Sequence, residues 1–261
     1  PFYGQDGQYV TSRHLRERLL KETERDVALR VEEVGGDSFK VSGRGVLHLS
    51  ILIENMRREG FEMSVAQPQV ILKERHGKKE EPIEILHVDV PDEHAGKIIE
   101  LAGMRQGEMV DMEQHGLRKM IRFEIPTRGL IGLRSKMLTA STGEAIVTHR
   151  FLRYDPYKGP IQQRQNGVLI SQGRGSSVPF AIDGLQQRGI FFVDPGVDCY
   201  EGMIVAEHCL DNDLVVNLQK TKQLTNMRAS GSDRAMKIAP AQKKSLEEAL
   251  EYIAEDELVE I

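Results

Sequence analysis

The sequence predicts an α+β protein in which two domains of split β-α-β type are followed by a β-rich domain with a terminal helix. Residues 82–151 give strand and helix signals in the order β-α-β-β-α-β, and residues 12–72 repeat most of that order. Short apolar runs separated by glycines then follow. A length of 261 residues allows two domains or three small ones, and we expect them at residues 1–76, 80–158 and 161–261.

The first domain is expected to have the order α-β-β-α-β. A helix near Ser12–Thr23 buries Leu15 and Leu19, and a second helix runs from Val46 to Arg58 and ends before Gly60. Its strands are expected around residues 27–31, 39–41 and 61–72. Because the opening strand of the split β-α-β order is missing here, we expect the sequence to be part of a longer protein.

The second domain is expected to contain all six elements. A strand at Pro82–Val90 precedes a helix that Asp92 caps and that buries Ile98 and Ala102. Two strands then follow at residues 108–114 and 117–125. A helix at residues 127–141 and a final strand at residues 145–151 complete the domain. Residues 76–82 are expected to be the hinge between the two domains.

The third domain is expected to be a small, mostly antiparallel β domain. Its short strands are expected at residues 168–170, 178–182, 190–193, 203–206 and 214–218. Ser245 and Glu248 form a capping-box pattern, which predicts a terminal helix with Leu250 and Ile253 on its buried face.

Composition excludes several classes of protein. Hydrophobic residues make up 39% of the chain and charged residues 29%, which is typical of a folded globular protein. No apolar run exceeds four residues, whereas a membrane span needs about 20, so we expect a cytoplasmic protein with no membrane contact. Two cysteines exclude a four-cysteine zinc site, and neither a GxxxxGK[ST] nor a GxSxG sequence occurs. The chain therefore resembles a binding module more than an enzyme.

Charge is distributed unevenly along the chain, although the formal net charge is only −5. Residues 247–261 carry seven acidic side chains and no Lys or Arg, whereas residues 217–237 carry five basic side chains and the single acid Asp233. Residues 217–237 also contain no Phe, Tyr or Trp, so we expect this basic segment to recognise the shape and backbone of folded RNA rather than unpaired bases. From charge alone, a solvated loop remains the alternative.

Three stretches resemble a known family. VSGRGVLHLSILIENMRREGFEMSV resembles domain III of translational GTPases of the elongation factor G type, and EPIEILHVDVP with IPTRGLIGLRSKMLTASTGEAIVTHRFLRYDPYKG resembles their domain V. YEGMIVAEH, LTNMRASGSDRA and LEEALEYIAEDELVEI resemble the C-terminal domain of the BipA, or TypA, family. In fold terms, the resemblance implies two ferredoxin-like domains followed by the family's own C-terminal domain.

The resemblance also implies a function. Family members act at the factor site of the ribosome, in assembly of the large subunit and in stress or low-temperature growth. We therefore expect the ribosome, large-subunit rRNA and A-site tRNA as partners. GTP and Mg²⁺ are expected in a GTPase domain that would precede Pro1, so this part of the protein is expected to be non-catalytic and to hold no cofactor. A basic tail that family members usually carry after the LVE segment is not represented, and oligomeric state is left open.

Candidate RNA-binding residues follow from the same resemblance. In the basic segment they are Lys220, Lys222, Arg228, Ser230, Arg234 and Lys237. In the two ferredoxin-like domains they are Arg44, Arg57, Arg58, Arg105, Arg128 and Arg134. Each of this second group could equally be an ordinary surface charge.

Two other functions use the same fold. A tandem ferredoxin-like regulatory module would bind a small metabolite between its domains. An acylphosphatase-like hydrolase would hold phosphate in the loop after its first strand, and that place in the second domain, PDEHAG, offers no Arg. Fold alone cannot decide among these functions.

Overall fold

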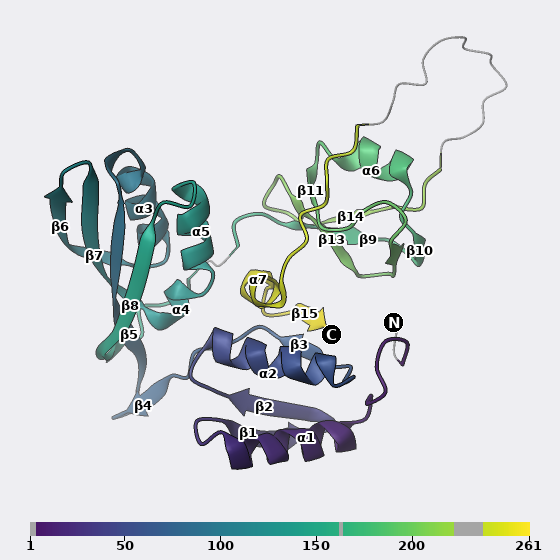
Figure 1. Ribbon diagram of the computed structural model, residues 1–261, viewed down its shortest axis with the longest axis horizontal. Coiled ribbons are helices and arrows are strands. Elements are labelled where there is room, and N and C mark those ends of the chain that lie inside the picture. The colour runs from purple at the N-terminus through teal and green to yellow at the C-terminus, as the bar shows by residue number, and fades with distance from the viewer. Residues whose placement is uncertain (1–3, 162–163, 222–236) are drawn as a thin grey trace, which may run out of the picture. The chain divides into compact units, whose positions relative to one another are not determined.

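The computed structural model describes residues 4–161, 164–221 and 237–261 (Figure 1). The chain divides into two compact units. One unit is formed by Arg164–Ser245, and the other by Phe2–Gln163 together with Leu246–Ile261. Within the described residues, every helix is too short or too polar to cross a bilayer.

The first domain has the expected element order. Its elements are α1 (Ser12–Arg25), β1 (Arg30–Gly35), β2 (Ser38–Ser42), α2 (Val46–Arg58) and β3 (Ser64–Ala66). The Thr11 side chain accepts a hydrogen bond from the His14 backbone N–H at 3.4 Å and so caps α1. A small core of Leu19, Leu29, Leu52, Met56 and Phe61 joins the two helices to the β1–β2 hairpin.

One of its predicted strands is shifted and another is shorter than expected. Strand β1 begins at Arg30, and Val27 is 96% exposed instead of lying in the strand. The strand expected over residues 61–72 is reduced to β3, which pairs with neither β1 nor β2. Its partner is β15 (Leu258–Glu260), with Val65 opposite Val259. The sheet of this domain is therefore made of two separate two-stranded pieces.

The last sixteen residues pack with the first domain. Helix α7 (Leu246–Tyr252) contacts α2, and Leu250 is fully buried. The Gln67 side-chain amide donates a hydrogen bond to the Ile253 carbonyl at 2.5 Å. Residues 246–261 of the predicted domain 161–261 therefore pack with the first domain, through the α7–α2 contact and the β3–β15 pairing, and not with residues 164–245.

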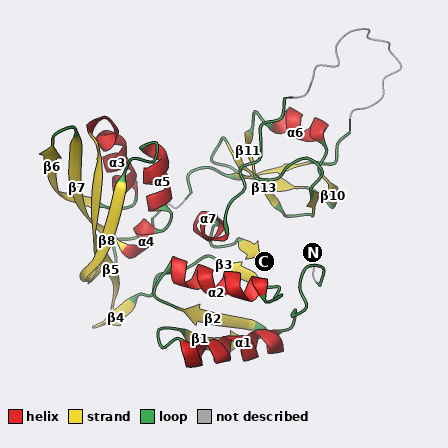
Figure 2. Ribbon diagram, in the orientation of Figure 1, coloured by secondary structure: helices red, strands yellow, loops and turns green. Residues whose placement is uncertain are grey.

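The second domain is a complete split β-α-β sheet. Its elements are β5 (Lys78–Pro91), α3 (Asp92–Met104), β6 (Glu108–His115), β7 (Arg118–Pro126), α4 (Thr127–Leu130), α5 (Leu133–Ala140) and β8 (Ile146–Pro156). The strands lie in the order β8-β5-β7-β6 and every neighbouring pair is antiparallel. Helices α3 and α5 lie against one face of the sheet, where Leu86, Val88, Ile121 and Phe123 are buried (Figure 2).

Three details of this domain differ from the expectation. The expected hinge is a hairpin, because β4 (Lys73–Arg75) turns at His76-Gly77 and pairs with the start of β5. Pro91, not Asp92, is the capping residue of α3. The helix expected over 127–141 is divided into α4 and α5, because Gly132 has a left-handed backbone with φ of 70°.

The β-rich unit is built on a four-stranded sheet. Its elements are β9 (Val168–Ser171), β10 (Gly175–Ser176), α6 (Pro179–Leu185), β11 (Gly189–Phe191), β12 (Asp198–Cys199), β13 (Ile204–His208) and β14 (Leu214–Val216). The sheet order is β11-β13-β9-β14, in which the β14–β9 pair is parallel. The strand expected at residues 178–182 is instead α6, whose first helical residue is Pro179.

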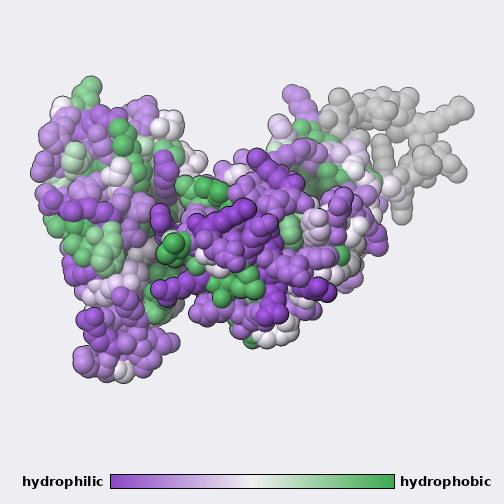
Figure 3. Space-filling view, turned by 60° about the horizontal axis from the view of Figure 1, so that its bottom comes forward, coloured by the Kyte–Doolittle hydropathy of each residue, from purple (hydrophilic) through white to green (hydrophobic). Residues whose placement is uncertain are grey.

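Buried apolar side chains form three clusters, one for each domain. Figure 3 shows a largely hydrophilic face with separate small hydrophobic patches. Patches of this kind are ordinary for a protein surface.

Candidate nucleic-acid interface

The first and last cations of the basic segment are exposed lysines. Lys220 and Lys237 are both exposed, whereas Lys222, Arg228, Ser230 and Arg234 lie outside the described residues. The geometry of the candidate interface is therefore set by the chain on either side of residues 222–236.

The chain that enters the basic segment is fixed beside the start of α6. The Val178 backbone N–H donates a hydrogen bond to the Leu218 carbonyl at 2.9 Å, and Leu218 is fully buried. The Gln219 side-chain amide donates to the Gly175 carbonyl at 3.2 Å. Lys220 thus directly follows two residues, Leu218 and Gln219, that hydrogen bonds fix to the chain around α6.

The chain that leaves the basic segment is fixed at the other end of the same helix. The Gln186 side-chain amide donates to the Lys237 carbonyl at 3.0 Å, and its oxygen accepts from the Ala239 N–H at 3.3 Å. Ile238 packs against the core of the β-rich unit. Both anchors belong to one compact unit, so Lys220 and Lys237 are presented from a common scaffold.

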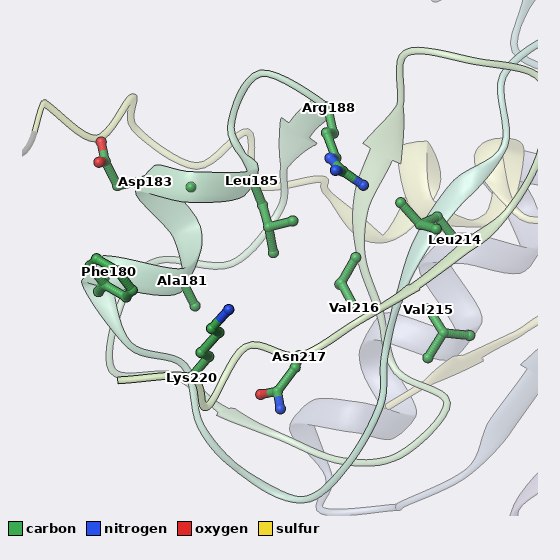
Figure 4. Close-up of a pocket in the computed structure, with 11 residues that line it drawn as sticks. Phe180, Ala181, Asp183, Leu185, Arg188, Leu214, Val215, Val216, Asn217 and Lys220 are labelled. Atoms are coloured by element: carbon green, nitrogen blue, oxygen red, sulfur yellow. The ribbon is translucent and has the colours of Figure 1, made fainter. Parts of the chain in front are cut away.

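A pocket of about 450 Å³ opens next to Lys220 (Figure 4). Helix α6 supplies Phe180, Ala181 and Leu185 to its wall, and β14 supplies Val216. Sequence reasoning missed this pocket. It assigned residues 178–182 to a strand and therefore did not place Phe180 beside the basic segment. Pro179 is the sequence signal that could have indicated the helix, because Pro is common at the first position of a helix.

The three arginines predicted in the first domain have different surroundings. Arg44 is exposed and has no ion-pair partner within the described residues. Arg57 and Arg58 are exposed at the end of α2, but both contact the Glu54 carboxylate at 2.8 Å. Hydrogen bonds from these two guanidinium groups lower the pKa of Glu54 to about 2. Their positive charge is therefore partly compensated within the helix.

The second domain places two of its three predicted arginines away from the surface. Arg105 is only 5% exposed, and burial lowers the pKa of its guanidinium group. The Arg128 side chain is 14% exposed and its Nε donates to Glu81 Oε2 at 2.5 Å. The placement of both side chains does not fit the predicted surface contacts. Arg134 is exposed and has no ion-pair partner among the described residues, and its role as a contact residue stays a prediction.

Two features of a nucleotide-hydrolysing site are absent, one from the sequence and one from the described residues. The sequence contains no GxxxxGK[ST] loop to surround phosphates and orient Mg²⁺. In the described ranges, no group of three or more His, Cys, Asp or Glu side chains is placed to hold a metal ion. No chemical step is therefore assigned to GTP or Mg²⁺ in this chain.

Comparison with known proteins gives two family matches and a set of close relatives. The family model described as TypA/BipA C-terminal domain matches residues 166–261, and that described as Elongation factor G C-terminus matches residues 78–165. The whole chain is 50% identical to the large ribosomal subunit assembly factor BipA of Salmonella typhimurium and 48% identical to that of Bacillus subtilis. The chain belongs to the BipA family. It is similar to the C-terminal part of these relatives and spans 44% and 43% of their respective lengths.

The BipA family match accounts for the architecture. The elongation factor G match covers the split β-α-β sheet of the second domain, and the predicted fold class is confirmed. The BipA C-terminal match covers the β-rich unit together with residues 246–261, which pack on the first domain. A single BipA family domain thus contributes to two compact units.

Proposed function

We propose that this chain is the ribosome-contacting C-terminal part of a BipA-type translational GTPase that takes part in assembly of the large ribosomal subunit. Identity of about half over the full chain to proteins named as large-subunit assembly factors is the observation that carries the proposal. GTP and Mg²⁺ binding is assigned to the part of those relatives that this chain does not span. Action at the ribosomal factor site, in the cytoplasm and under stress or at low temperature, belongs to the same proposal.

RNA phosphates are the proposed ligands of the basic segment. Five cations and one acid within residues 217–237 give it a strongly positive charge, and flexible Lys and Arg side chains suit phosphate contacts without reading sequence. Exposure of Lys220 and Lys237 on a shared scaffold supports this assignment. Large-subunit rRNA and A-site tRNA are the proposed RNAs, with exposed Arg44 and Arg134 as further contacts.

Salt-dependent binding to ribosomal subunits tests the proposal. Each lost phosphate contact is expected to reduce the slope of log affinity against log salt by about 0.7 to 0.9. A Lys220→Glu/Lys237→Glu variant should therefore co-sediment less with large subunits and lose up to about two units of slope. Extending the reversal to Lys222, Arg228 and Arg234 should weaken binding further.

A matched control changes the net charge by the same amount elsewhere. Arg13 and Lys97 lie on helices and pair with Glu17 and Glu100. An Arg13→Glu/Lys97→Glu variant should bind subunits like the wild type. If both double variants lost the same amount of binding to large subunits, net charge alone would explain the effect and the proposed interface would be contradicted.

A further inference from the structure

The pocket beside Lys220 has an apolar interior. Ala181, Leu185 and Val216 line it and offer no side-chain hydrogen-bonding groups. Figure 4 shows Leu185 and Lys220 pointing into the same space, whereas Asp183 points away from it. Its volume of about 450 Å³ lies in the range of small-molecule sites.

An aromatic ring is available at one end of this space. Phe180 lies in the first turn of α6 and remains 38% exposed, although most aromatic side chains of this size are buried in cores. Bases of nucleic acids stack on such rings with little dependence on their identity. The basic segment itself has no aromatic residue, so α6 supplies the group that the segment lacks.

The pocket rim carries positive charge. Arg188 and Lys220 both line the pocket and are exposed, and neither has a carboxylate partner in the described part of the chain. The one lining acid, Asp183, accepts a hydrogen bond from the Gln186 side-chain amide at 2.9 Å. An apolar, aromatic interior with cations at its rim matches a planar base attached to a phosphate.

We infer that this pocket binds one unpaired nucleotide of an RNA, with its base against Phe180 and its phosphates at Lys220 and Arg188. The inference rests on the proposed function and adds a second mode of contact to it. Phosphate contacts along the basic segment position the RNA, and the pocket takes a base that has left the stack. Ala181, Leu185 and Val216 offer the base no polar side chain, and the oxygen of the lining Asn217 amide already accepts a hydrogen bond from the Gln219 N–H at 2.9 Å. We therefore expect base preference to be weak.

Fluorescence anisotropy of the whole chain with labelled RNA tests the inference. The probes are an oligoadenylate and an oligouridylate of about six nucleotides, and an RNA duplex as the paired reference. Both single strands should bind more tightly than the duplex at the same salt concentration. Phe180→Ala should weaken single-strand binding by about fivefold or more, because stacking of one base on one ring accounts for at least that difference.

Two variants separate stacking from loss of structure. Phe180→Tyr keeps an aromatic ring and should retain single-strand affinity within about threefold. Ile190→Ala removes a side chain that is 51% exposed on β11 and does not line the pocket, so it should bind like the wild type. The inference is overturned if Phe180→Ala binds like the wild type, if Ile190→Ala loses as much affinity, or if the duplex binds as tightly as the single strands.

Subunit co-sedimentation distinguishes this inference from the proposed function. A chain that does not bind ribosomal subunits, yet binds single strands in a Phe180-dependent way, would refute the proposed function and leave the pocket assignment intact. A chain that binds subunits with the expected salt slope, while Phe180→Ala leaves single-strand affinity unchanged, would refute the pocket alone.

Discussion

Arg128→Ala should destabilise the second domain by about 3 to 5 kcal/mol, the usual cost of breaking a buried ion pair. Glu81 is 1% exposed and accepts hydrogen bonds from Arg128 Nε at 2.5 Å and Nη2 at 3.2 Å. Without the guanidinium group, the Lys158 backbone N–H at 2.7 Å is the remaining donor to this carboxylate among the residues that the structure describes. The Arg128 guanidinium also lies 4.5 Å from the Tyr157 ring centroid, a contact that adds about 0.5 to 1 kcal/mol.

Native-state hydrogen exchange is the suitable assay, because it reports the opening of one domain within a chain of several. The Ile121 and Phe123 amides lie in the middle of β7, in the centre of the sheet. A loss of 3 kcal/mol or more should speed their exchange by a factor of about 100 or greater, since each 1.4 kcal/mol is tenfold. Amides of the β-rich unit should exchange as in the wild type.

Arg122→Ala provides the matched control in the same sheet. Arg122 and Asp111 form an ion pair at 3.0 Å with both side chains over 40% exposed, so its loss should cost about 0.2 to 1 kcal/mol. A Glu81→Leu/Arg128→Met variant should recover most of the loss, because it leaves no buried charge unpaired. Similar exchange rates for Arg128→Ala and Arg122→Ala would refute the reasoning.

Two further predictions concern pH and backbone packing. His149 Nδ1 lies 2.5 Å from Glu84 Oε2, and this hydrogen bond raises the pKa of His149 above 6.5. The ion pair therefore adds stability that is complete below pH 6.5 and is lost as the pH rises through the raised pKa of His149. Thermal unfolding should show that the wild type loses this stability over that pH range, whereas His149→Gln does not. A Cβ at Gly189 would overlap the Glu207 carbonyl oxygen on β13, so Gly189→Ala should destabilise the β-rich unit by about 2 kcal/mol or more. A Cβ added at Gly184 in α6 would have no neighbouring heavy atom within 4 Å, so Gly184→Ala should be neutral or stabilising in the same unfolding measurement. Parallel pH curves for His149→Gln and wild type, or equal stability of the two glycine variants, would contradict these expectations.

Elements with local signals could be predicted from the sequence. Helix α2 occupies Val46–Arg58 as expected, because an apolar stripe lies between glycines at 45 and 60 that favour its ends. The sheet of the second domain was also predictable, because its strands are separated by clear turn and cap residues. These signals depend on neighbours in the sequence.

Features that depend on distant partners could not be predicted. The apolar residues after Phe61 suggested a long strand, but only β3 forms, and its partner β15 lies about 190 residues later in the chain. The sequence predicts Arg128 as an RNA contact, because its partner Glu81 is separated from it by 47 positions and gives no local signal of pairing. Sequence indicated where cations gather, but their burial and pairing are tertiary properties.

The packing of residues 246–261 with the first domain determines how the β-rich unit is connected to the rest of the chain. The β-rich unit is an insertion whose entry and exit both connect to the same neighbour, so it is doubly tethered. A protease cut in either connection would leave the two fragments associated through β3–β15 pairing and the α2–α7 contact. Removal of the C-terminal sixteen residues would instead strip Leu250 and β15 from the first domain, so tail truncation is expected to loosen helices near the opposite end of the chain.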